Sequence, residues 1–317
     1  MSLETPIAFC IFNRPDLTKR VFEAIARQRP RHLLVIGDGP RVDRPDEARQ
    51  VAETRRVIER VDWDCDVRLQ FSDTNLGCRR RIETGLTWAF DQHEELIILE
   101  DDCLPDDSFF HYCQTLLRKY RDDHRVMMIS GDQFNPQPES PYSYYFSKWA
   151  HIWGWASWRR AWNLFDEGMT SWPEAKENQW LESMIDQPCE LDHWTRICDQ
   201  LYQGEIDTWD WPWMYSCWIQ SGLTILPHVN LVTNIGFDER ATHTRDPESF
   251  QSRLPTGSIL SLRHPPNVSR DCTADRWTLE NIFQHDMTEP QRPPWLSRKV
   301  RQVKRILDPK RYQRAAA

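Results

Sequence analysis

The sequence has no apolar run near the roughly 20 residues that a helix needs to cross a bilayer. Residues 1–6 also lack the basic flank and hydrophobic stretch of a signal peptide. Nine cysteines occur without a CxxC pair or a Cys/His zinc spacing, which favours reduced thiols. These absences predict a cytoplasmic protein.

Positive charge is in deficit as well. The 317 residues contain 40 Lys and Arg against 48 Asp and Glu, a formal net charge of −8 at pH 7. Proteins that bind nucleic acid concentrate positive charge to neutralise phosphates, so this balance argues against such a partner. Hydrophobic residues make up 39 % of the chain, enough for the core of a large α/β domain.

Short apolar runs alternate with helical patterns over the first 130 residues. The runs predict strands that are buried on both faces, at residues 7–12, 33–36, 67–71, 96–99 and 126–129. Apolar residues at helical spacing lie between them, as at Leu17, Val21 and Ile25. This alternation predicts an α/β fold with a mostly parallel sheet flanked by helices.

The later part of the chain is rich in tryptophan. Twelve of the 16 tryptophans lie between Trp149 and Trp218, among helical segments that we expect to cover the sheet. Two short strands are predicted at residues 223–226 and 229–232. We therefore expect one domain at residues 1–245, an irregular extension at 246–290 and a basic tail at 291–317.

The strand at residues 96–99 runs directly into Glu100, Asp101 and Asp102. Open α/β sheets bind ligands at the carboxyl edge of their strands, and Mg²⁺ or Mn²⁺ on a diphosphate needs one or two carboxylates. The alternative is that these acids face solvent or cap the next helix, where Asp106 or Asp107 would be the N-cap. The sequence thus predicts a metal and phosphate site.

This region resembles the acidic motif of inverting N-acetylglucosaminyltransferase I and its bacterial relatives. The resemblance lies in an apolar strand followed by Glu-Asp-Asp and then by Pro-Asp-Asp-Ser-Phe-Phe at residues 105–110. That motif is a variant of the DxD signature of the GT-A fold, a Rossmann-like fold. The resemblance implies that Asp102 binds the metal directly. It places Glu100 and Asp101 near the ribose and the donor sugar.

Further turns resemble the nucleotide subsite of family-2-type glycosyltransferases. Asn13 and Arg14 follow the first strand, and Asp38 follows the second, where its carboxylate can accept the imide N–H of uracil. Turn chemistry in Gly-Asp-Gly explains Asp38 equally well. Asn75 and Arg79, after the third strand, resemble the turn beside the donor diphosphate, although a solvated basic helix start is the alternative.

Residues 207–214 resemble the Trp-Asp-Asp-Trp-Met run in which an aspartate deprotonates the acceptor. Asp210 is then the general base and Asp207 the alternate, unless Asp210 only caps a helix at residues 212–221. Residues 153–162 resemble a helix start between donor and acceptor, where Trp155 could contact a sugar. His243 resembles the C-terminal histidine that closes over the metal in many GT-A enzymes.

Together these resemblances imply an inverting, metal-dependent glycosyltransferase. Its donor would be a nucleotide-diphosphate sugar, a UDP-sugar being favoured, and its acceptor a hydroxyl of a glycan, lipid-linked molecule or protein. A sugar nucleotidyltransferase is one alternative, although residues 12–16 lack the glycine usual in its first loop. A non-catalytic carbohydrate-binding protein is the other.

The last segment is strongly basic. Nine Lys and Arg face one acid between residues 291 and 314, a net charge of +8 that leaves −16 on the rest of the chain. With apolar residues along one helical face, this pattern is typical of a helix on an anionic membrane surface. Packing of the tail on its own acidic domain is the alternative.

Overall fold

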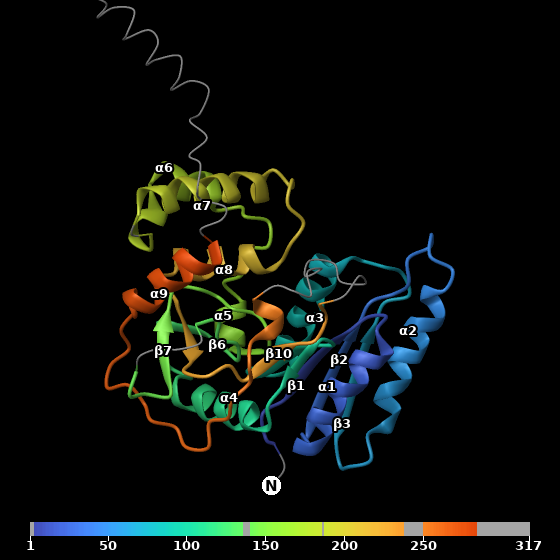
Figure 1. Cartoon of the computed structure of the whole chain (residues 1–317). Helices are drawn as coiled ribbons and strands as arrows, with labels where there is room; N and C mark the ends of the chain where they lie inside the picture. Colours follow the sequence, from blue (N-terminus) through green and yellow to red (C-terminus); the bar gives the residue numbers. More distant parts are fainter. Residues whose placement is uncertain (1–2, 136–139, 186, 238–249, 284–317) are drawn as a thin grey trace, which may run out of the picture.

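The computed structural model describes residues 3–135, 140–185, 187–237 and 250–283 (Figure 1). Within them an eight-stranded sheet has the order β3-β2-β1-β4-β8-β6-β9-β7. Its strands are β1 (Ile7–Ile11), β2 (His32–Gly37), β3 (Asp66–Phe71), β4 (Glu95–Glu100), β6 (Val126–Ser130), β7 (Tyr144–Ser147), β8 (Trp155–Trp158) and β9 (Leu223–Pro227). Only β7 and β8 pair antiparallel with their neighbours, which confirms the predicted α/β class with a mostly parallel sheet.

Helices cover both faces of this sheet and form a separate helical layer (Figure 1). The α-helices are α1 (Pro15–Gln28), α2 (Glu47–Arg56), α3 (Cys78–Gln92), α4 (Asp107–Lys119), α5 (Arg159–Trp162), α6 (Trp172–Glu177), α7 (Pro188–Tyr202), α8 (Asp210–Ile219) and α9 (Cys272–Thr278). Short turns of other helix types are η1 (Val57–Arg60), η2 (Trp180–Ser183), η3 (Gln251–Arg253) and η4 (Leu279–Phe283). None of the helices described is long and apolar enough to cross a membrane.

Two strands differ from their prediction. β3 was expected to be buried on both faces, but Leu69 in it is 52 % exposed, because β3 is the last strand of the sheet and pairs with β2 alone. The strand expected at 229–232 is instead β10 (Val232–Asn234), which pairs with β5 (Cys103–Pro105) in a separate two-stranded sheet. This small sheet brings residues 234–237 to the end of β4.

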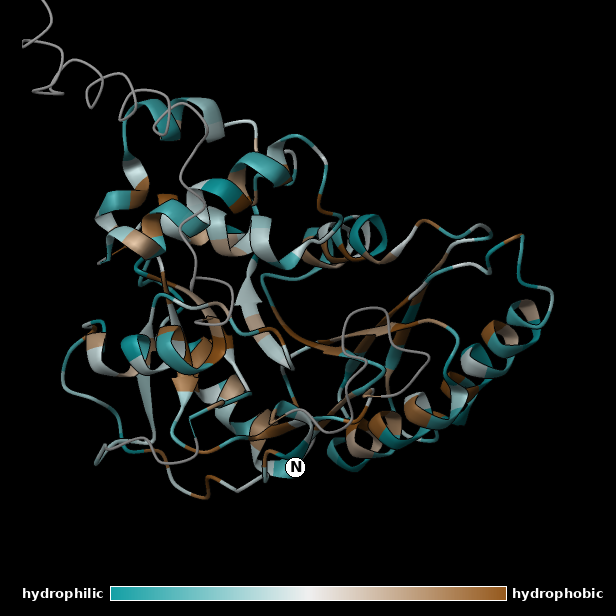
Figure 2. Cartoon of the chain, turned by 45° about the horizontal axis from the view of Figure 1, so that its top comes forward, coloured by the Kyte–Doolittle hydropathy of each residue, from teal (hydrophilic) through white to brown (hydrophobic). Residues whose placement is uncertain are grey.

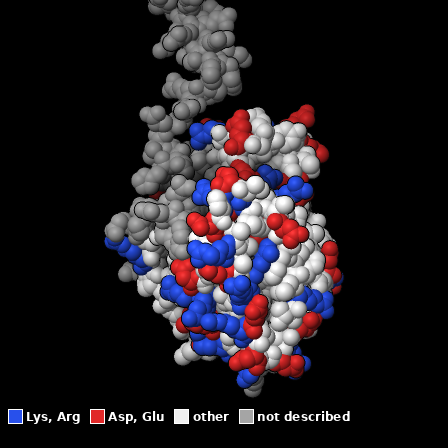
Figure 3. Space-filling view, turned by 90° about the vertical axis from the view of Figure 1, so that its right-hand side faces the viewer, with Lys and Arg blue, Asp and Glu red and all other residues white. Residues whose placement is uncertain are grey.

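α2 lies at the right of Figure 1, where it packs on α1 and η1. On that face of the molecule, Figure 3 shows Lys and Arg side chains interspersed with Asp and Glu. Charges of both signs therefore alternate there, and neither sign forms a continuous patch.

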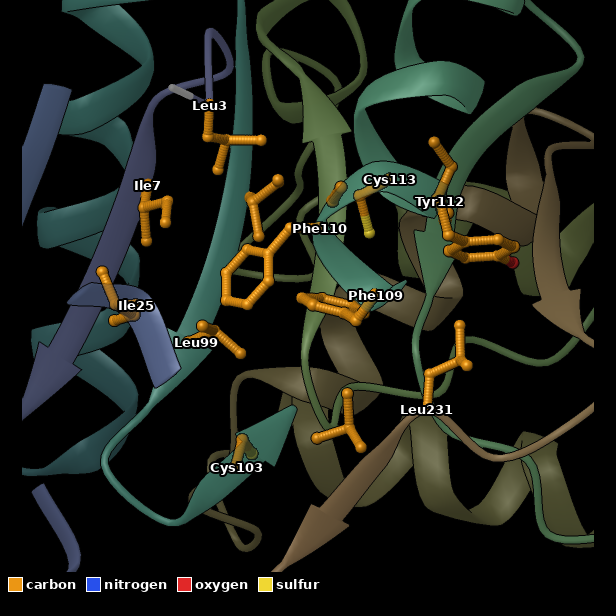
Figure 4. Close-up of a cluster of buried hydrophobic side chains, with 14 of the residues drawn as sticks. Leu3, Ile7, Ile25, Leu99, Cys103, Phe109, Phe110, Tyr112, Cys113 and Leu231 are labelled. Carbon is orange, nitrogen blue, oxygen red and sulfur yellow. The ribbon is translucent and has the colours of Figure 1, made fainter. Parts of the chain in front are cut away.

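The apolar core is split by the sheet, several of whose strands are brown in Figure 2. One face packs on α1 and α4, where Phe109 and Phe110 of α4 lie beside Leu99 of β4 (Figure 4). The other face packs on α3, α5 and α8. A third cluster around Trp149 joins α6, α7 and α8, so the tryptophan-rich half does cover the sheet as expected.

Residues 250–283, within the segment expected to be an irregular extension, pack on the main domain. Ile259 belongs to the core beside α4, and its N–H donates to the Ser108 hydroxyl at 3.0 Å. Asp275 in α9 accepts a hydrogen bond from the Ser147 hydroxyl of β7 at 2.5 Å. This part of the chain therefore belongs to the same packed body as the sheet.

Candidate functional site

Glu100, Asp101 and Asp102 at the end of β4 lie where the order of the strands reverses. From β1 the chain builds β2 and β3 on one side and then returns to β4 on the other, with Cys10 of β1 opposite Glu100 of β4. In open α/β sheets, the carboxyl ends of two such strands form a ligand crevice. Residues 12–14 and 100–102 therefore meet at the position where this architecture binds ligands.

Arg14 connects the two strand ends. Its Nη2 donates to the Asp101 carboxylate and, at 2.8 Å, to Oδ2 of Asp102, while the Phe12 N–H donates to Asp101 at 3.1 Å. Burial raises the pKa of Asp101 to about 6, and Arg14 opposes that rise. Two of the three predicted carboxylates are thus held by one guanidinium.

Glu100 has no such partner. Its carboxylate makes no hydrogen bond or ion pair among the described residues, and the side chain is partly buried. Burial and the charges of Asp102 and Asp101 together raise the pKa of Glu100 to about 8, although the charge of Arg14 opposes this rise. The three acids Glu100, Asp101 and Asp102, here called the acidic centre, thus share one guanidinium, and Glu100 is mostly protonated at neutral pH unless a cation favours its charged form.

The helical half adds Asp210 to this centre. Asp210 is the first residue of α8, and its charge contributes to the raised pKa of Glu100, which places it near the strand end. The Thr208 hydroxyl donates to its carboxylate. The alternative N-cap role is not observed, because the helix spans 210–219 and its N-cap is Trp209. The alternate Asp207 is exposed and also lies near the site, since burial and the charges of Glu100, Asp210, Asp102 and Asp207 together raise the pKa of Cys78.

The helix after the acidic motif is capped by Asp106. Its carboxylate accepts the Ser108 N–H at 2.9 Å, as the capping alternative expected for this position. Capping therefore accounts for Asp106 and leaves Glu100, Asp101 and Asp102 to be explained by the crevice.

Asp38 and Asn75 lie together, and their side chains form hydrogen bonds that join the loop after β2 to the loop after β3. The Asp38 carboxylate accepts the N–H groups of Gly39, Leu76 and Gly77 and the Asn75 amide, at 2.9 to 3.1 Å. A carboxylate offers about four lone-pair sites, and these donors occupy them. This is the turn role that the sequence left open, and it leaves no acceptor site for the imide N–H of a base.

Asn13 and Arg79 face other partners. The Asn13 amide donates at 2.9 Å to Glu47, a buried carboxylate of α2 that also binds Arg41. Arg79 donates from Nε to Glu83 at 3.0 Å and from Nη2 to the Glu167 carbonyl at 2.5 Å. The structure thus does not bring these two side chains to the acidic centre.

A helix does begin within residues 153–162, since α5 starts at Arg159, but Trp155 does not lie on it. Trp155 lies in β8, between β4 and β6, and is 1 % exposed because the rings of Trp209 and Trp213 pack against it at 5.7 and 5.9 Å. It is a core residue, and its ring is covered. Trp158 and Trp162 are also buried. His243 and the tail at 291–314 lie outside the described residues.

Sequence reasoning missed the role of Gly236. A Cβ at this position would lie 2.8 Å from Nη1 of Arg14 and 2.8 Å from Cβ of Asp102, so the ion pair needs a glycine there. The Ile235 N–H also donates to the Asp102 carbonyl at 2.8 Å. The Asn-Ile-Gly-Phe run after the last strand was the signal for this contact.

The described residues contain no group of three His, Cys, Asp or Glu side chains arranged to hold a metal ion. A cation that arrives on a diphosphate needs fewer protein ligands, since phosphate oxygens and water complete its shell. Oδ1 of Asp102 has the Cys103 thiol at 3.6 Å as its polar neighbour, and Glu100 makes no ion pair among these residues. These two carboxylates fit a cation of that kind.

No protein-family model and no curated protein matches the sequence. Among solved structures, a 4-diphosphocytidyl-2C-methyl-D-erythritolsynthase from Anaerococcus prevotii is similar over 63 % of this chain and 84 % of its own, with 10 % identity and a TM-score of 0.29. The inositol-1-phosphate CTP transferase of T. maritima is similar over 52 % of this chain and 75 % of its own, with 8 % identity and a TM-score of 0.30. The mannosyltransferase PcManGT from Pyrobaculum calidifontis, in complex with GDP-Man and Mn²⁺, is similar over 68 % of this chain and 69 % of its own, with 14 % identity and a TM-score of 0.33. At these values, the function of this chain has to follow from its own site geometry.

Proposed function

We propose that this protein is an inverting, metal-dependent GT-A-type glycosyltransferase that uses a nucleotide-diphosphate sugar. The observation that carries the proposal is the carboxyl group of Glu100, without an ion-pair partner among the described residues, beside Asp102 at the strand-order reversal and with Asp210 nearby. A crevice at this position suits a nucleotide, and its cluster of carboxyl groups suits a cation that accompanies a diphosphate.

Each residue has a role in this reaction. Arg14 holds Asp101 and Asp102 in place, and Asp102 is the ligand for Mn²⁺ or Mg²⁺. When bound, the cation supplies charge neutralisation to the departing diphosphate. Asp210 accepts the proton of the acceptor hydroxyl, whose oxygen attacks the anomeric carbon while the bond from that carbon to the diphosphate oxygen breaks. Direct displacement inverts the configuration and needs no covalent intermediate.

The donor and the place of action belong to the same proposal. A UDP-sugar remains our favoured donor, although Asp38 has no lone pair left for uracil, so other groups of the crevice would read the base. The acceptor is a glycan, a lipid-linked molecule or a protein hydroxyl. The enzyme would act in the cytoplasm, with no nucleic-acid partner.

Thermal shift with UDP, GDP, CDP and their sugars, with and without Mn²⁺, tests this proposal. A bound nucleotide raises stability by about 2.7 kcal/mol at a hundredfold excess over Kd. We expect an Mn²⁺-dependent shift with one diphosphate family and its loss in Asp102→Asn. Equal shifts in Asp102→Asn and the unchanged protein would contradict the metal role of Asp102.

Product analysis separates the enzyme classes. A glycosyltransferase hydrolyses or transfers from a nucleotide-diphosphate sugar and releases the nucleoside diphosphate. A nucleotidyltransferase instead consumes a nucleoside triphosphate with a sugar phosphate and releases pyrophosphate, and that result would replace our proposal. A protein that binds sugars but turns over neither substrate would be a carbohydrate-binding protein.

A further inference from the structure

A second polar cluster lies at the same edge of the sheet as the acidic centre. β8 is antiparallel to both β4 and β6, so β6 ends at the edge where β4 ends. Asp132 follows β6 and His151 precedes β8, and the Gly131 N–H donates to the Gly154 carbonyl at 2.7 Å between their loops. The two side chains therefore lie one strand away from Glu100.

These side chains are buried without full partners. Asp132 is 1 % and His151 6 % exposed, yet Oδ2 of Asp132 and both ring nitrogens of His151 have no hydrogen-bond partner in the described part of the chain. His151 Nδ1 lies 4.0 Å from Oδ2 of Asp132, too far for a hydrogen bond. The Asn230 amide nitrogen is also unpartnered. Buried polar atoms are normally satisfied, so this cluster is suited to a polar guest.

A strip of aromatic rings connects the acidic centre with this cluster. Gly236 packs on Asp102, and the next residue, Phe237, has its ring 5.7 Å from that of Trp153. The Trp153 ring lies 5.1 Å from Phe134, which in turn lies 4.6 Å from the His151 ring. The three rings of Phe237, Trp153 and Phe134 are partly buried, so part of each side chain is exposed.

The chemistry of this strip matches a carbohydrate. Aromatic faces pack on the C–H surface of a sugar ring, and polar groups at the end of the strip bond its hydroxyls. Burial lowers the pKa of His151 to about 3 and raises that of Asp132 to about 7. At neutral pH the histidine is therefore uncharged and the carboxyl group is close to its midpoint, which favours a neutral polyol over a charged ligand.

We propose that Phe237, Trp153 and Phe134 form the subsite for the acceptor sugar, and that Asp132 and His151 bind its hydroxyls at the far end. This inference rests on the proposed function, because the acidic centre has to hold the donor for the subsite to receive an acceptor. It assigns the sugar contact to Trp153, in place of the buried Trp155.

Saturation-transfer NMR with a panel of methyl glycosides tests the subsite without a donor. We expect one or more glycosides to bind, and their affinity to fall at least about tenfold in Trp153→Ala and in Phe237→Ala. Trp180→Ala is the matched control, since Trp180 is an exposed tryptophan of η2 and should leave binding unchanged. Circular dichroism confirms that each variant is folded.

His151→Gln, which keeps polar groups in the cluster, tests the positioning role. For a glycosylated acceptor we expect KM for the acceptor to rise at least about tenfold while kcat and nucleotide affinity change little. Equal glycoside binding in Trp153→Ala and the unchanged protein, or no glycoside binding at all, would overturn the subsite. Failure of nucleotides to bind would overturn the proposed function instead, so the two failures are distinguishable.

Discussion

Within the acidic centre, Glu100 has the carboxyl group whose pKa is raised most. Its pKa of about 8 lies above the usual 4.5 because of burial and the neighbouring acids Asp102 and Asp101. Between these pH values the folded state holds a proton that the unfolded state has lost, so stability falls as pH rises. A bound cation would stabilise the charged form of Glu100 and so remove this loss of stability. A ligand site that is destabilising when empty is expected to behave in this way.

Replacing Glu100 by Gln should therefore raise the thermal midpoint relative to the unchanged protein. The gain should be small at about pH 3.5, where Glu100 is protonated in both states, and largest at pH 8 and above, where the charge is forced on the folded state. Thermal unfolding at the two pH values measures it. Glu205→Gln, at an exposed position, is the control, and a gain that does not change with pH would contradict the explanation.

Asp210→Asn tests the general base. The variant should bind the donor almost normally, because in the proposed reaction Asp210 acts on the acceptor alone, and should transfer at least about a hundredfold more slowly because no base accepts the proton. Donor affinity and single-turnover transfer measure the two effects. Asp207→Asn is the matched variant: if it shows the loss and Asp210→Asn does not, the base is Asp207.

At the scale of elements, the site is assembled by three loops from different parts of the chain. The loop after β1 supplies Arg14, the turn between β4 and β5 supplies Asp101 and Asp102, and the residues after β10 supply Gly236. Pairing of β10 with β5 holds the third loop against the second. The small sheet thus fixes the distance between the ion pair and the aromatic strip.

Gly236→Ala should disturb this assembly. The added Cβ would displace Asp102, whose own Cβ lies at 2.8 Å, and with it the Arg14 pair. We expect metal-dependent nucleotide affinity to fall at least about tenfold, while the thermal midpoint changes little because the contact lies at the edge of the sheet. Gly168→Ala is the control, since its Cβ would meet Thr170 at 3.3 Å, outside the site. Unchanged nucleotide affinity in Gly236→Ala would refute the close contact.

The elements also show where local patterns mislead. Residues 155–158 have tryptophans at a spacing that suits a helix, yet they form β8 because β4 and β6 pair with them on both sides. The apolar run at 67–71 correctly predicts a strand, but its exposure depends on its place at the end of the sheet order. The local sequence pattern predicts neither the pairing of residues 155–158 nor the position of residues 67–71 at the end of the sheet.

At the scale of the whole molecule, charge is divided between the tail and the rest. Residues 291–314 carry +8 and the rest of the chain −16. The face in Figure 3 mixes both signs, so that face presents no continuous acidic patch for the tail to cover. An anionic membrane offers such a surface, and each basic residue near it contributes about 1 kcal/mol.

The full chain should therefore sediment with vesicles that contain anionic lipid, and less so at high salt, because screening weakens the attraction. Truncation after Pro290 should abolish this binding, whereas vesicles of neutral lipid should bind neither protein. If the full chain stays in solution with anionic vesicles at low salt, the tail has another role, such as packing on its own domain.

The sequence by itself determined the sheet class and the edge at which the site lies. Apolar runs that alternate with helical patterns require crossover connections, and parallel strands place all their carboxyl ends on one edge, so the acids after β4 had to lie there. Only the tertiary structure decided which groups remain available to a ligand. Arg14 and Asp101 are 87 residues apart and Asp38 and Asn75 are 37 apart, and contacts over such separations depend on the packing of whole elements. The ion pair of Arg14, the saturation of Asp38 and the burial of Trp155 all arise at that level, because they depend on which neighbours the fold brings within a few ångströms.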